Sequence, residues 1–359
     1  MKNTLKLMSV LSMSVMLLAS CEKLADNYGR PVIFSSSQSS QVTKATYGDY
    51  DASIHHQDIN WKPGDELRVF SAEALDPNNK PFADYRITGE GSTSGITPCT
   101  EDVDLRWGNP DDKGKYNFYS IYPLPSDSKD IVTVSMNSYF ASGDIYGDQT
   151  PASADVTKDD DGNFTVGTNL PKYMMMVANK SVSDNNTTVN LDFRPLTTVI
   201  QFTIQNGTGE DLPIYGLELR SKSTAMPLSG PFTLNIGTLD TDGYEICRYS
   251  AESVATENCR VKMKLDDVSL AVGKSITFTF FLHPSVDLSD LTLGLYRTAT
   301  WCRYTTIQHT DGTGVTFRKH MKTIVDGLCL PAGMKWTMAV DGQLKSWTVN
   351  SSELLDFEE

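Results

Sequence analysis

Cys21 is the residue whose chemistry the sequence specifies most clearly. It follows Leu18-Ala19-Ser20, the kind of small-residue pattern that a lipoprotein signal peptidase cleaves before a cysteine. A short basic start precedes a mostly apolar run at 7–18, which is too short to span a bilayer. The pattern predicts a signal peptide over residues 1–20 and a lipid on the Cys21 thiol, with an ordinary cleaved secretory signal as the alternative. Acyl chains contribute roughly 0.8 kcal/mol per buried methylene, so they hold a protein at a membrane without a spanning helix.

Two other groups of residues suggest metal chemistry, and neither has the required spacing. In a strand only His56 and Asp58 share a face, with His55 on the other, whereas a metal site needs three or four converging ligands. The acidic run at 159–163 has its glycine at the fourth position of a calcium loop instead of the sixth. We expect a solvated loop at the first, an acidic hairpin tip at the second, and no metal or cofactor.

No catalytic constellation is visible either. The Gly91–Gly95 segment has threonine where a nucleophile elbow needs serine, and we expect a flexible loop there. No acid pair stands out for glycoside hydrolysis, whose pairing is spatial. Most aromatic residues alternate with polar ones along the predicted strands, as buried core residues do, and so are not expected to bind sugars. Trp61, Trp107 and Trp301 differ, because they lie beside glycine, proline or loop residues. The sequence predicts a protein that is not an enzyme; a surface glycan-binding lipoprotein is the alternative function, and a secreted hydrolase needs an acid pair that the sequence does not display.

Charge and cysteine content narrow the possible partners. The net charge of −14 and the absence of any run of four basic residues argue against a nucleic-acid partner. The 359 residues are long enough for two domains of ordinary size. With Cys21 lipidated, five cysteines remain, and an odd number cannot pair completely within one chain. We therefore expect buried thiols and no complete disulfide framework.

The elements that follow the signal alternate between polar and apolar residues, which is the period of half-buried strands. The clearest alternating runs are Thr188–Phe193, Val199–Ile204, Phe232–Ile236 and Lys335–Val340, whereas Ile276–Leu282 is apolar on both faces, as expected of a central strand. Tight hairpin turns are predicted at Asn206-Gly207, Asp242-Gly243, Asp311-Gly312 and Asp341-Gly342. Many short strands joined by such turns predict an all-β chain of antiparallel sandwiches.

Two polar stretches divide the chain, Ser35–Gln41 and Ser181–Asn186. We place the domain boundary near residue 186. The expected organisation is a signal peptide over 1–20, an N-terminal strand segment over 21–44, an N-terminal β-sandwich over 45–186 and a C-terminal β-sandwich over 187–359.

Spaced landmarks along the whole chain resemble the fimbrillin-type lipoproteins of Bacteroidales, which form type V pili. Besides the lipidation pattern, they are Pro31–Ser37, Val42–Thr46, Trp61–Phe70, Tyr119–Pro123, Phe193–Ile200 and Leu330–Trp336. The resemblance implies two tandem transthyretin-like antiparallel β-sandwich domains after a lipoprotein signal peptide. It also implies a structural pilus subunit, of the shaft or the tip, that mediates adhesion. Such a subunit reaches the cell surface as a precursor with its lipid in the outer membrane.

In that family a trypsin-like protease removes the first strand, and a strand of another subunit fills the groove. The resemblance places the cut between Lys44 and Ala45, although this chain has lysine where arginine is usual. At the other end, Trp347, Val349, Leu355 and Phe357 share strand parity, which suits a donor strand or a plain final strand of the second domain equally. The expected partners are other pilus subunits, the processing protease and the outer membrane.

Overall fold

The protein is built almost wholly of β-strands, which confirms the predicted fold class. The computed structural model describes residues 29–38, 46–51, 56–91, 93–108, 116–124, 131–135, 138–145, 147–167, 173–183, 188–243, 245–249, 256–298, 301–307 and 313–330. Within these residues the helical segments are single turns, for example Ser153–Asp155 and Thr256–Cys259. No helix among them is long and apolar enough to cross a membrane.

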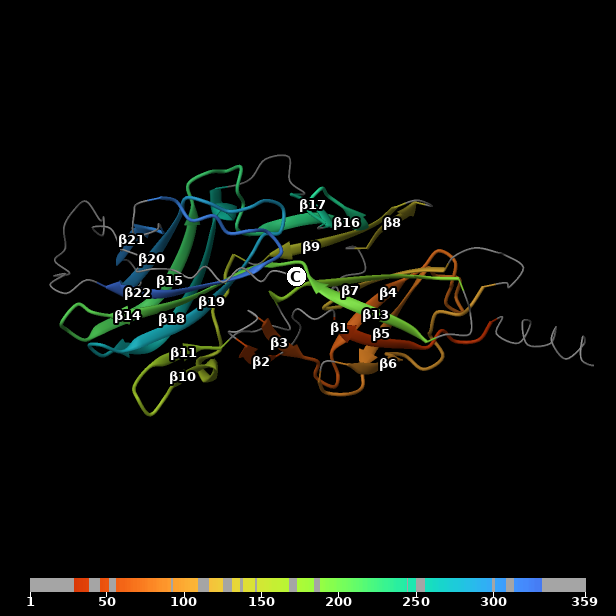
Figure 1. Ribbon diagram of the computed structural model, residues 1–359, viewed down its shortest axis with the longest axis horizontal. Helices are drawn as coiled ribbons and strands as arrows, with labels where there is room; N and C mark the ends of the chain where they lie inside the picture. The colour runs from red at the N-terminus through yellow and green to blue at the C-terminus, as the bar shows by residue number, and fades with distance from the viewer. Residues whose placement is uncertain are drawn as a thin grey trace, which may run out of the picture.

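Seven strands close into a barrel in the half of the molecule at the right of Figure 1. In barrel order they are β1 (Phe34–Gln38), β13 (Val189–Pro195), β12 (Met176–Val182), β7 (Tyr116–Tyr122), β4 (Glu66–Phe70), β5 (Phe82–Ile87) and β6 (Ser94–Pro98). Alternate residues point inward, as the period of two requires. Leu67, Phe118 and Leu191 are fully buried in this way.

Two further sheets pack face to face in the other half. A five-stranded sheet contains β10 (Val156–Lys158), β11 (Phe164–Val166), β19 (Ser275–Leu282), β14 (Thr198–Asn206) and β22 (Lys322–Leu330). A four-stranded sheet contains β18 (Arg260–Leu270), β15 (Leu212–Ser221), β20 (Leu291–Thr298) and β21 (Trp301–Thr306). The inward side chains of both sheets form one apolar cluster, to which Phe202, Phe278 and Leu217 belong. This half is a β-sandwich, as the sequence predicts, but its five-stranded sheet is not purely antiparallel, because β22 runs parallel to β14 and β11 runs parallel to β19.

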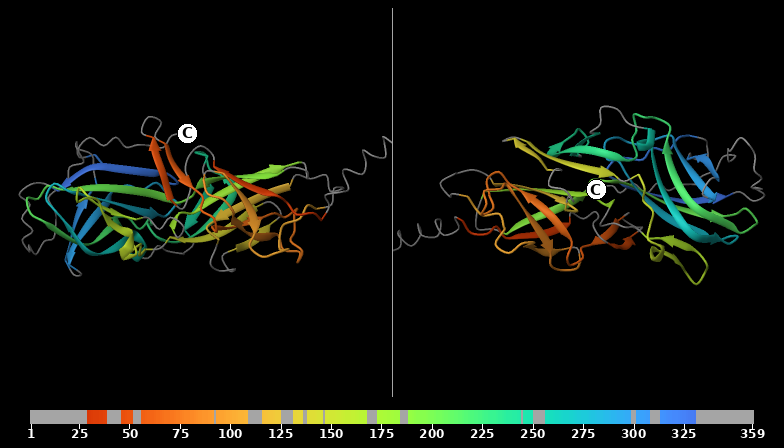
Figure 2. Two further views of the ribbon diagram at one scale, coloured as in Figure 1. Left: turned by 90° about the horizontal axis from the view of Figure 1, so that it is seen from below. Right: turned by 180° about the vertical axis from the view of Figure 1, so that it is seen from behind.

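A third sheet covers one outer face of the barrel (Figures 1 and 2). Its strands are β17 (Glu245–Tyr249), β16 (Gly230–Leu239), β9 (Ser138–Ile145) and β8 (Ile131–Ser135). Phe232 and Leu234 of β16 join Phe70 and Ile121 of the barrel in one buried cluster. Gly237 allows the close approach, since a Cβ at that residue would lie 2.6 Å from the ring of Tyr119.

The strands do not group by sequence order. The predicted boundary near residue 186 falls between β12 and β13, which are hydrogen-bonded neighbours in the barrel. Before that boundary, β11 pairs with β19 of the sandwich and β9 pairs with β16. Strands that precede residue 186 therefore pair with strands that follow it, in the barrel, in the sandwich and in the third sheet. A separate hairpin of β2 (Thr46–Asp51) and β3 (His56–Asn60) lies midway along the molecule (Figure 2).

Side-chain hydrogen bonds, as well as shared strands, connect the barrel to the sandwich. The side chain of Gln149 donates to the carbonyl of Phe281 (2.6 Å) and accepts from its N–H (3.0 Å), as a neighbouring strand would. Phe281 itself belongs to the core of the barrel, together with Val199 of β14. The His320 N–H donates to Thr198 Oγ1 (3.0 Å), and its ring Nδ1 lies 2.6 Å from the carbonyl oxygen of Leu196. These contacts continue the barrel core into the sandwich.

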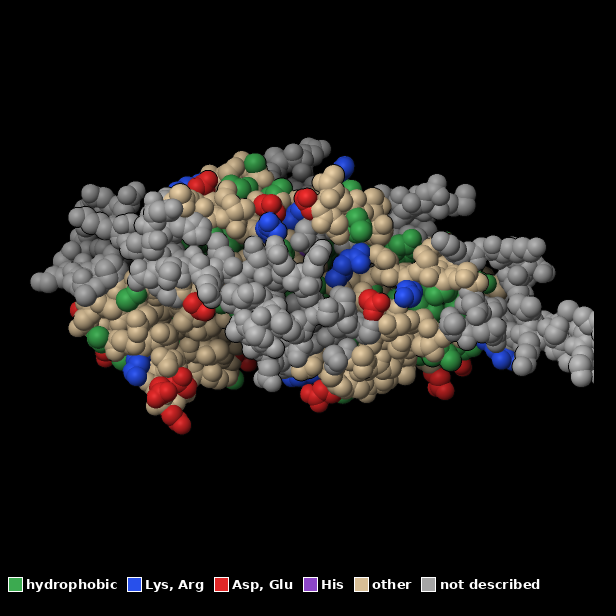
Figure 3. All heavy atoms as spheres, in the orientation of Figure 1, with side chains coloured by type: hydrophobic (Ala, Val, Ile, Leu, Met, Phe, Trp, Pro, Cys, Tyr) green, Lys and Arg blue, Asp and Glu red, His purple; other side chains and the backbone are tan. Residues whose placement is uncertain are grey.

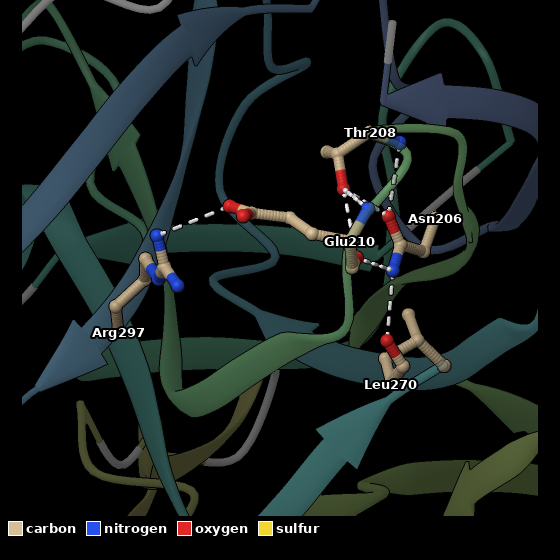
Figure 4. A network of polar contacts seen from close by, with 5 residues as sticks. All are labelled: Asn206, Thr208, Glu210, Leu270 and Arg297. Carbon is tan, nitrogen blue, oxygen red and sulfur yellow. Dashed lines mark hydrogen bonds and ion pairs between the residues drawn. The ribbon is translucent and has the colours of Figure 1, made fainter. Parts of the chain in front are cut away.

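The predicted hairpin turns have mixed outcomes. Gly243 has the expected positive φ of 85°. At Asn206-Gly207 the left-handed residue is Gly209, with φ 88°. Asn206 instead holds the loop from within, since its amide donates to the carbonyls of Leu270 (2.7 Å) and Glu210 (2.9 Å) (Figure 4). The turns at 311–312 and 341–342, and the strand at 335–340, lie outside the described residues.

Candidate functional site

The strand β1 occupies the position where the sequence predicts a removable first strand. It lies between β13, to which it is parallel, and β6, to which it is antiparallel, and so closes the barrel (Figure 1). Phe34 pairs with Val189, and Ser35 pairs with both Asn190 and Gly95. We call the space that residues 32–38 fill between β13 and β6 the β1 site.

Val32 and Phe34 anchor the strand in the barrel core. They are 4% and 2% exposed, whereas Ile33 between them is 66% exposed. The ring of Phe34 packs edge-on against Tyr85 (5.1 Å between centroids) and Phe118 (5.2 Å). Burial of two such side chains stabilises the closed barrel by roughly 1.5–3 kcal/mol each.

The backbone before β1 is also paired. Gly29 N–H donates to Trp107 O (3.1 Å), and Val32 N–H donates to Leu105 O (2.8 Å). In return Trp107 N–H donates to Arg30 O (3.0 Å). The first described segment, 29–38, is therefore held by hydrogen bonds to the loop before β7 as well as to β13 and β6.

The polar side chains of β1 are satisfied within the barrel wall. Ser36, which is 1% exposed, donates to the carbonyl of Ser94 (3.2 Å). Ser35 donates to Asn190 Oδ1 on the outer face (3.1 Å). Beside the site, burial raises the pKa of Tyr85, whose hydroxyl oxygen accepts the Leu105 N–H (2.8 Å). The two rings that contact Phe34, those of Tyr85 and Phe118, are uncharged at neutral pH.

This geometry suits strand replacement better than it suits catalysis. If β1 left, β13 and β6 would each present an unpaired backbone edge over an open apolar core. Such edges bind an extended segment through main-chain hydrogen bonds, and alternate side chains set its register. The described residues contain no group of three His, Cys, Asp or Glu side chains placed to hold a metal.

The remaining predicted site residues lie outside the described residues. These are the lipidation residue Cys21, the cleavage residues Lys44 and Ala45, and the donor-strand residues Trp347, Val349, Leu355 and Phe357. Lys44 is six residues beyond the end of β1 in the sequence.

The alternative sites resolve differently. Trp61 and Trp107 are buried, at 0% and 4% exposure, so neither offers a platform for a sugar.

The acidic run forms the predicted hairpin tip between β10 and β11, and Figure 3 shows its carboxylates projecting at the lower left. There Asp159 accepts from the N–H of Asn163 (2.8 Å). His56 and Asp58 lie on β3. Cys247 and Cys259 are buried, and Cys99 and Cys329 are partly exposed free thiols.

Arg68 is a buried charged residue that sequence reasoning missed. It stands on the outer face of β4 and is 7% exposed. Its guanidinium pairs with Asp84 through two nitrogens, Nη2 at 2.8 Å from Oδ2, and lies 4.6 Å from the centroid of the Phe82 ring. A charged residue at an outward position of a strand is expected to face solvent, so its burial could not be predicted from the sequence.

Comparison with known proteins gives a likeness in structure alone. No family model matches the chain, and no curated protein matches its sequence. A solved structure from Bacteroides ovatus, described as a "putative cell adhesion protein", aligns with a TM-score of 0.53 at 15% identity, over 92% of this chain and 99% of that one. The chain has the fold of that protein. This agrees with the resemblance of its sequence to fimbrillin-type lipoproteins.

Two further structures align over most of both chains. A second protein of the same description, from Bacteroides uniformis, gives a TM-score of 0.46 at 12% identity, over 84% of this chain and 93% of that one. A fimbrial assembly protein from Parabacteroides distasonis gives 0.36 at 11% identity, over 85% and 93%.

Proposed function

We propose that this protein is a structural subunit of a type V pilus that mediates adhesion at the cell surface. Its precursor is anchored in the outer membrane through lipid on Cys21. Cleavage between Lys44 and Ala45 releases residues 21–44, β1 included. A strand from another subunit then fills the β1 site, and the subunits polymerise.

The observation that carries the proposal is the place of β1 in the barrel. The first described segment supplies two buried apolar side chains, Val32 and Phe34, to the core of the barrel. It pairs with strands that come much later, β6 and β13, so its loss leaves the rest of the barrel connected. The description of the Bacteroides ovatus neighbour as a "putative cell adhesion protein" supports the adhesive role.

The glycan-binding alternative receives no support from Trp61 or Trp107, and the side chain of Trp301 lies outside the described ones. It calls for exposed coplanar tryptophans in a cleft, and both Trp61 and Trp107 are packed inside the barrel, edge-on to other rings. We therefore keep one proposed function.

Limited trypsin treatment of the chain beginning at Cys21 tests the proposal. The Lys345→Gln variant is the parent for this experiment, because Lys345 offers a second cleavage site next to the predicted donor segment. We expect an early cut after Lys44 and conversion of monomers to oligomers in size-exclusion chromatography. The Lys44→Ala variant should remain monomeric.

A matched control separates cleavage from donation. Deleting residues 347–359 should leave the cut at Lys44 intact and abolish the oligomers. Assembly of the Lys44→Ala variant to the same extent as its parent would show that removal of β1 is not the trigger, and the proposed function would be wrong.

A further inference from the structure

Basic side chains gather on the outer face of the sheet formed by β18, β15, β20 and β21, in the half of the molecule at the left of Figure 1. The ladder register sets three outward positions of β18 beside three of β15 and three of β20. Row by row they are Lys264, Gly216 and Tyr296; Lys262, Glu218 and Gly294; and Arg260, Arg220 and Thr292. We call these nine positions the basic face. Four of them carry cations and one carries a carboxylate, although the net charge of the chain is −14.

The cations of β18 stand in a row. Arg260, Lys262 and Lys264 are exposed, and they alternate with Val261 and Met263, which are buried in the sandwich core. Alternate residues of a strand lie about 6.5 Å apart, so the row is about 13 Å long. The three side chains can therefore contact successive groups of one extended partner.

Arg260 stands directly opposite Arg220 in the ladder. Like charges at directly opposed positions destabilise a sheet. The salt bridges that the described residues form here join Arg220 with Glu218, Lys262 with Asp148, and Lys264 with Asp266. None of these three pairs includes Arg260. The fold thus keeps an arginine where it repels its neighbour, as expected of a residue that serves binding at some cost in stability.

Glu218 holds Arg220 in position. Its carboxylate is buried, with 1% of the residue exposed, and it accepts hydrogen bonds from the Tyr296 hydroxyl (2.7 Å) and from Arg220 Nε. The Arg220 side chain nevertheless remains 42% exposed. Its guanidinium is therefore presented at the surface in a fixed orientation, and this planar group matches two oxygens of one anionic group.

The basic face suits a linear polyanion better than a protein. A protein partner needs an apolar centre in which side chains become fully buried. The uncharged positions of the basic face hold glycine, threonine and the half-buried Tyr296. Clustered Lys and Arg attract polyanions such as heparin without an apolar centre.

We propose that the basic face binds an acidic polysaccharide, a linear glycan with closely spaced sulfate or carboxylate groups. Arg260, Lys262 and Lys264 contact successive acid groups along the glycan, and Arg220 binds an acid group beside them. Such a glycan is a ligand to which the subunit adheres. The site lies in the sandwich and includes no part of β1, so binding does not depend on the removal of that strand.

Binding of the uncut chain, beginning at Cys21, to heparin tests the proposal. We expect binding that weakens as salt is added, because exposed charges are screened, and no binding to neutral dextran. The double variant Lys262→Gln, Lys264→Gln should bind heparin at least about tenfold more weakly, since two charge contacts are lost. The matched control Lys62→Gln, Lys80→Gln removes the same charge from exposed residues of the barrel half, and its affinity should stay within about twofold of the parent.

The Arg260→Gln variant separates binding from folding. It should bind heparin at least about threefold more weakly. Its urea midpoint should equal or exceed that of the parent, because the repulsion from Arg220 is removed. Unchanged heparin affinity in both Arg260→Gln and the double variant would overturn the proposal. Equally tight binding of poly-glutamate or double-stranded DNA would also overturn it, since the basic face would then fit an acidic polypeptide or a nucleic acid as well as a polysaccharide.

Discussion

Replacing Phe34 by alanine should destabilise the uncut barrel more than any other change in β1. The ring is 2% exposed and packs edge-on against Tyr85 and Phe118. Phe-to-Ala substitutions at such sites cost about 3–5 kcal/mol, which includes the lost ring pairs and the cavity left behind. Because the ring is almost fully buried and contacts two other rings, we expect the higher part of this range.

Equilibrium urea unfolding, followed by circular dichroism, measures the effect on the uncut chain. Ile33→Ala is the matched control, since Ile33 is the next residue of the same strand and is 66% exposed. Its free energy of unfolding should stay within about 0.5 kcal/mol of the parent.

The same variant has a second expected effect. A weakened β1 should leave the barrel more readily, so Phe34→Ala should form oligomers faster than the parent once Lys44 is cut. A loss of less than about 1 kcal/mol, or a loss equal to that of Ile33→Ala, would contradict the view that Phe34 holds the strand in place.

Three further changes test the junction and the third sheet. Gln149→Leu should cost roughly 2–4 kcal/mol in urea unfolding, because the N–H and carbonyl of the buried Phe281 each lose their partner; an unchanged midpoint would refute this. Burial lowers the pKa of His283 to about 4, so the free energy of unfolding should fall by about 3 kcal/mol as pH drops from 6.5 toward 4, while the unfolded chain takes up a proton that the folded one does not. Urea midpoints across this window should vary less in His283→Asn, and an equal slope would exclude the assignment. Gly237→Ala should destabilise by roughly 1–3 kcal/mol, since its Cβ would lie 2.6 Å from the Tyr119 ring, and a neutral effect would show that the third sheet shifts freely.

The alternation of residues along single strands could be predicted from the sequence. Val189, Leu191 and Phe193 were expected on one face, and all three are buried in β13. Ile276–Leu282 was expected to be a central strand, and β19 pairs with strands on both sides. These features depend on one strand and one buried face, which a period of two encodes directly.

Strand partners could not be predicted in the same way. Nothing in the residues of β11 or β9 specifies pairing with β19 or β16, because parity fixes which face is buried and not which neighbour supplies the edge. The exchange of strands across residue 186 therefore appears only in the folded chain.

For the β1 site too, the buried face of the strand could be predicted from the sequence and its contacts could not. Val32 and Phe34 could be assigned to one face of a first strand from their spacing alone. Their contacts with Tyr85 and Phe118 depend on barrel closure, which brings together residues more than fifty positions apart. Trp61 shows the opposite case, since its glycine and proline neighbours indicate a loop, yet closure of the barrel buries it completely.

Mass spectrometry of the N-terminus of assembled material, isolated from the cells that make it, tests the central claim most directly. Removal of β1 after Lys44 predicts that the polymerised chain begins at Ala45, while the membrane-bound precursor begins at a lipidated Cys21. Polymers whose subunits still begin at Cys21 would contradict the account, because β1 would then remain covalently joined to a barrel that it already fills.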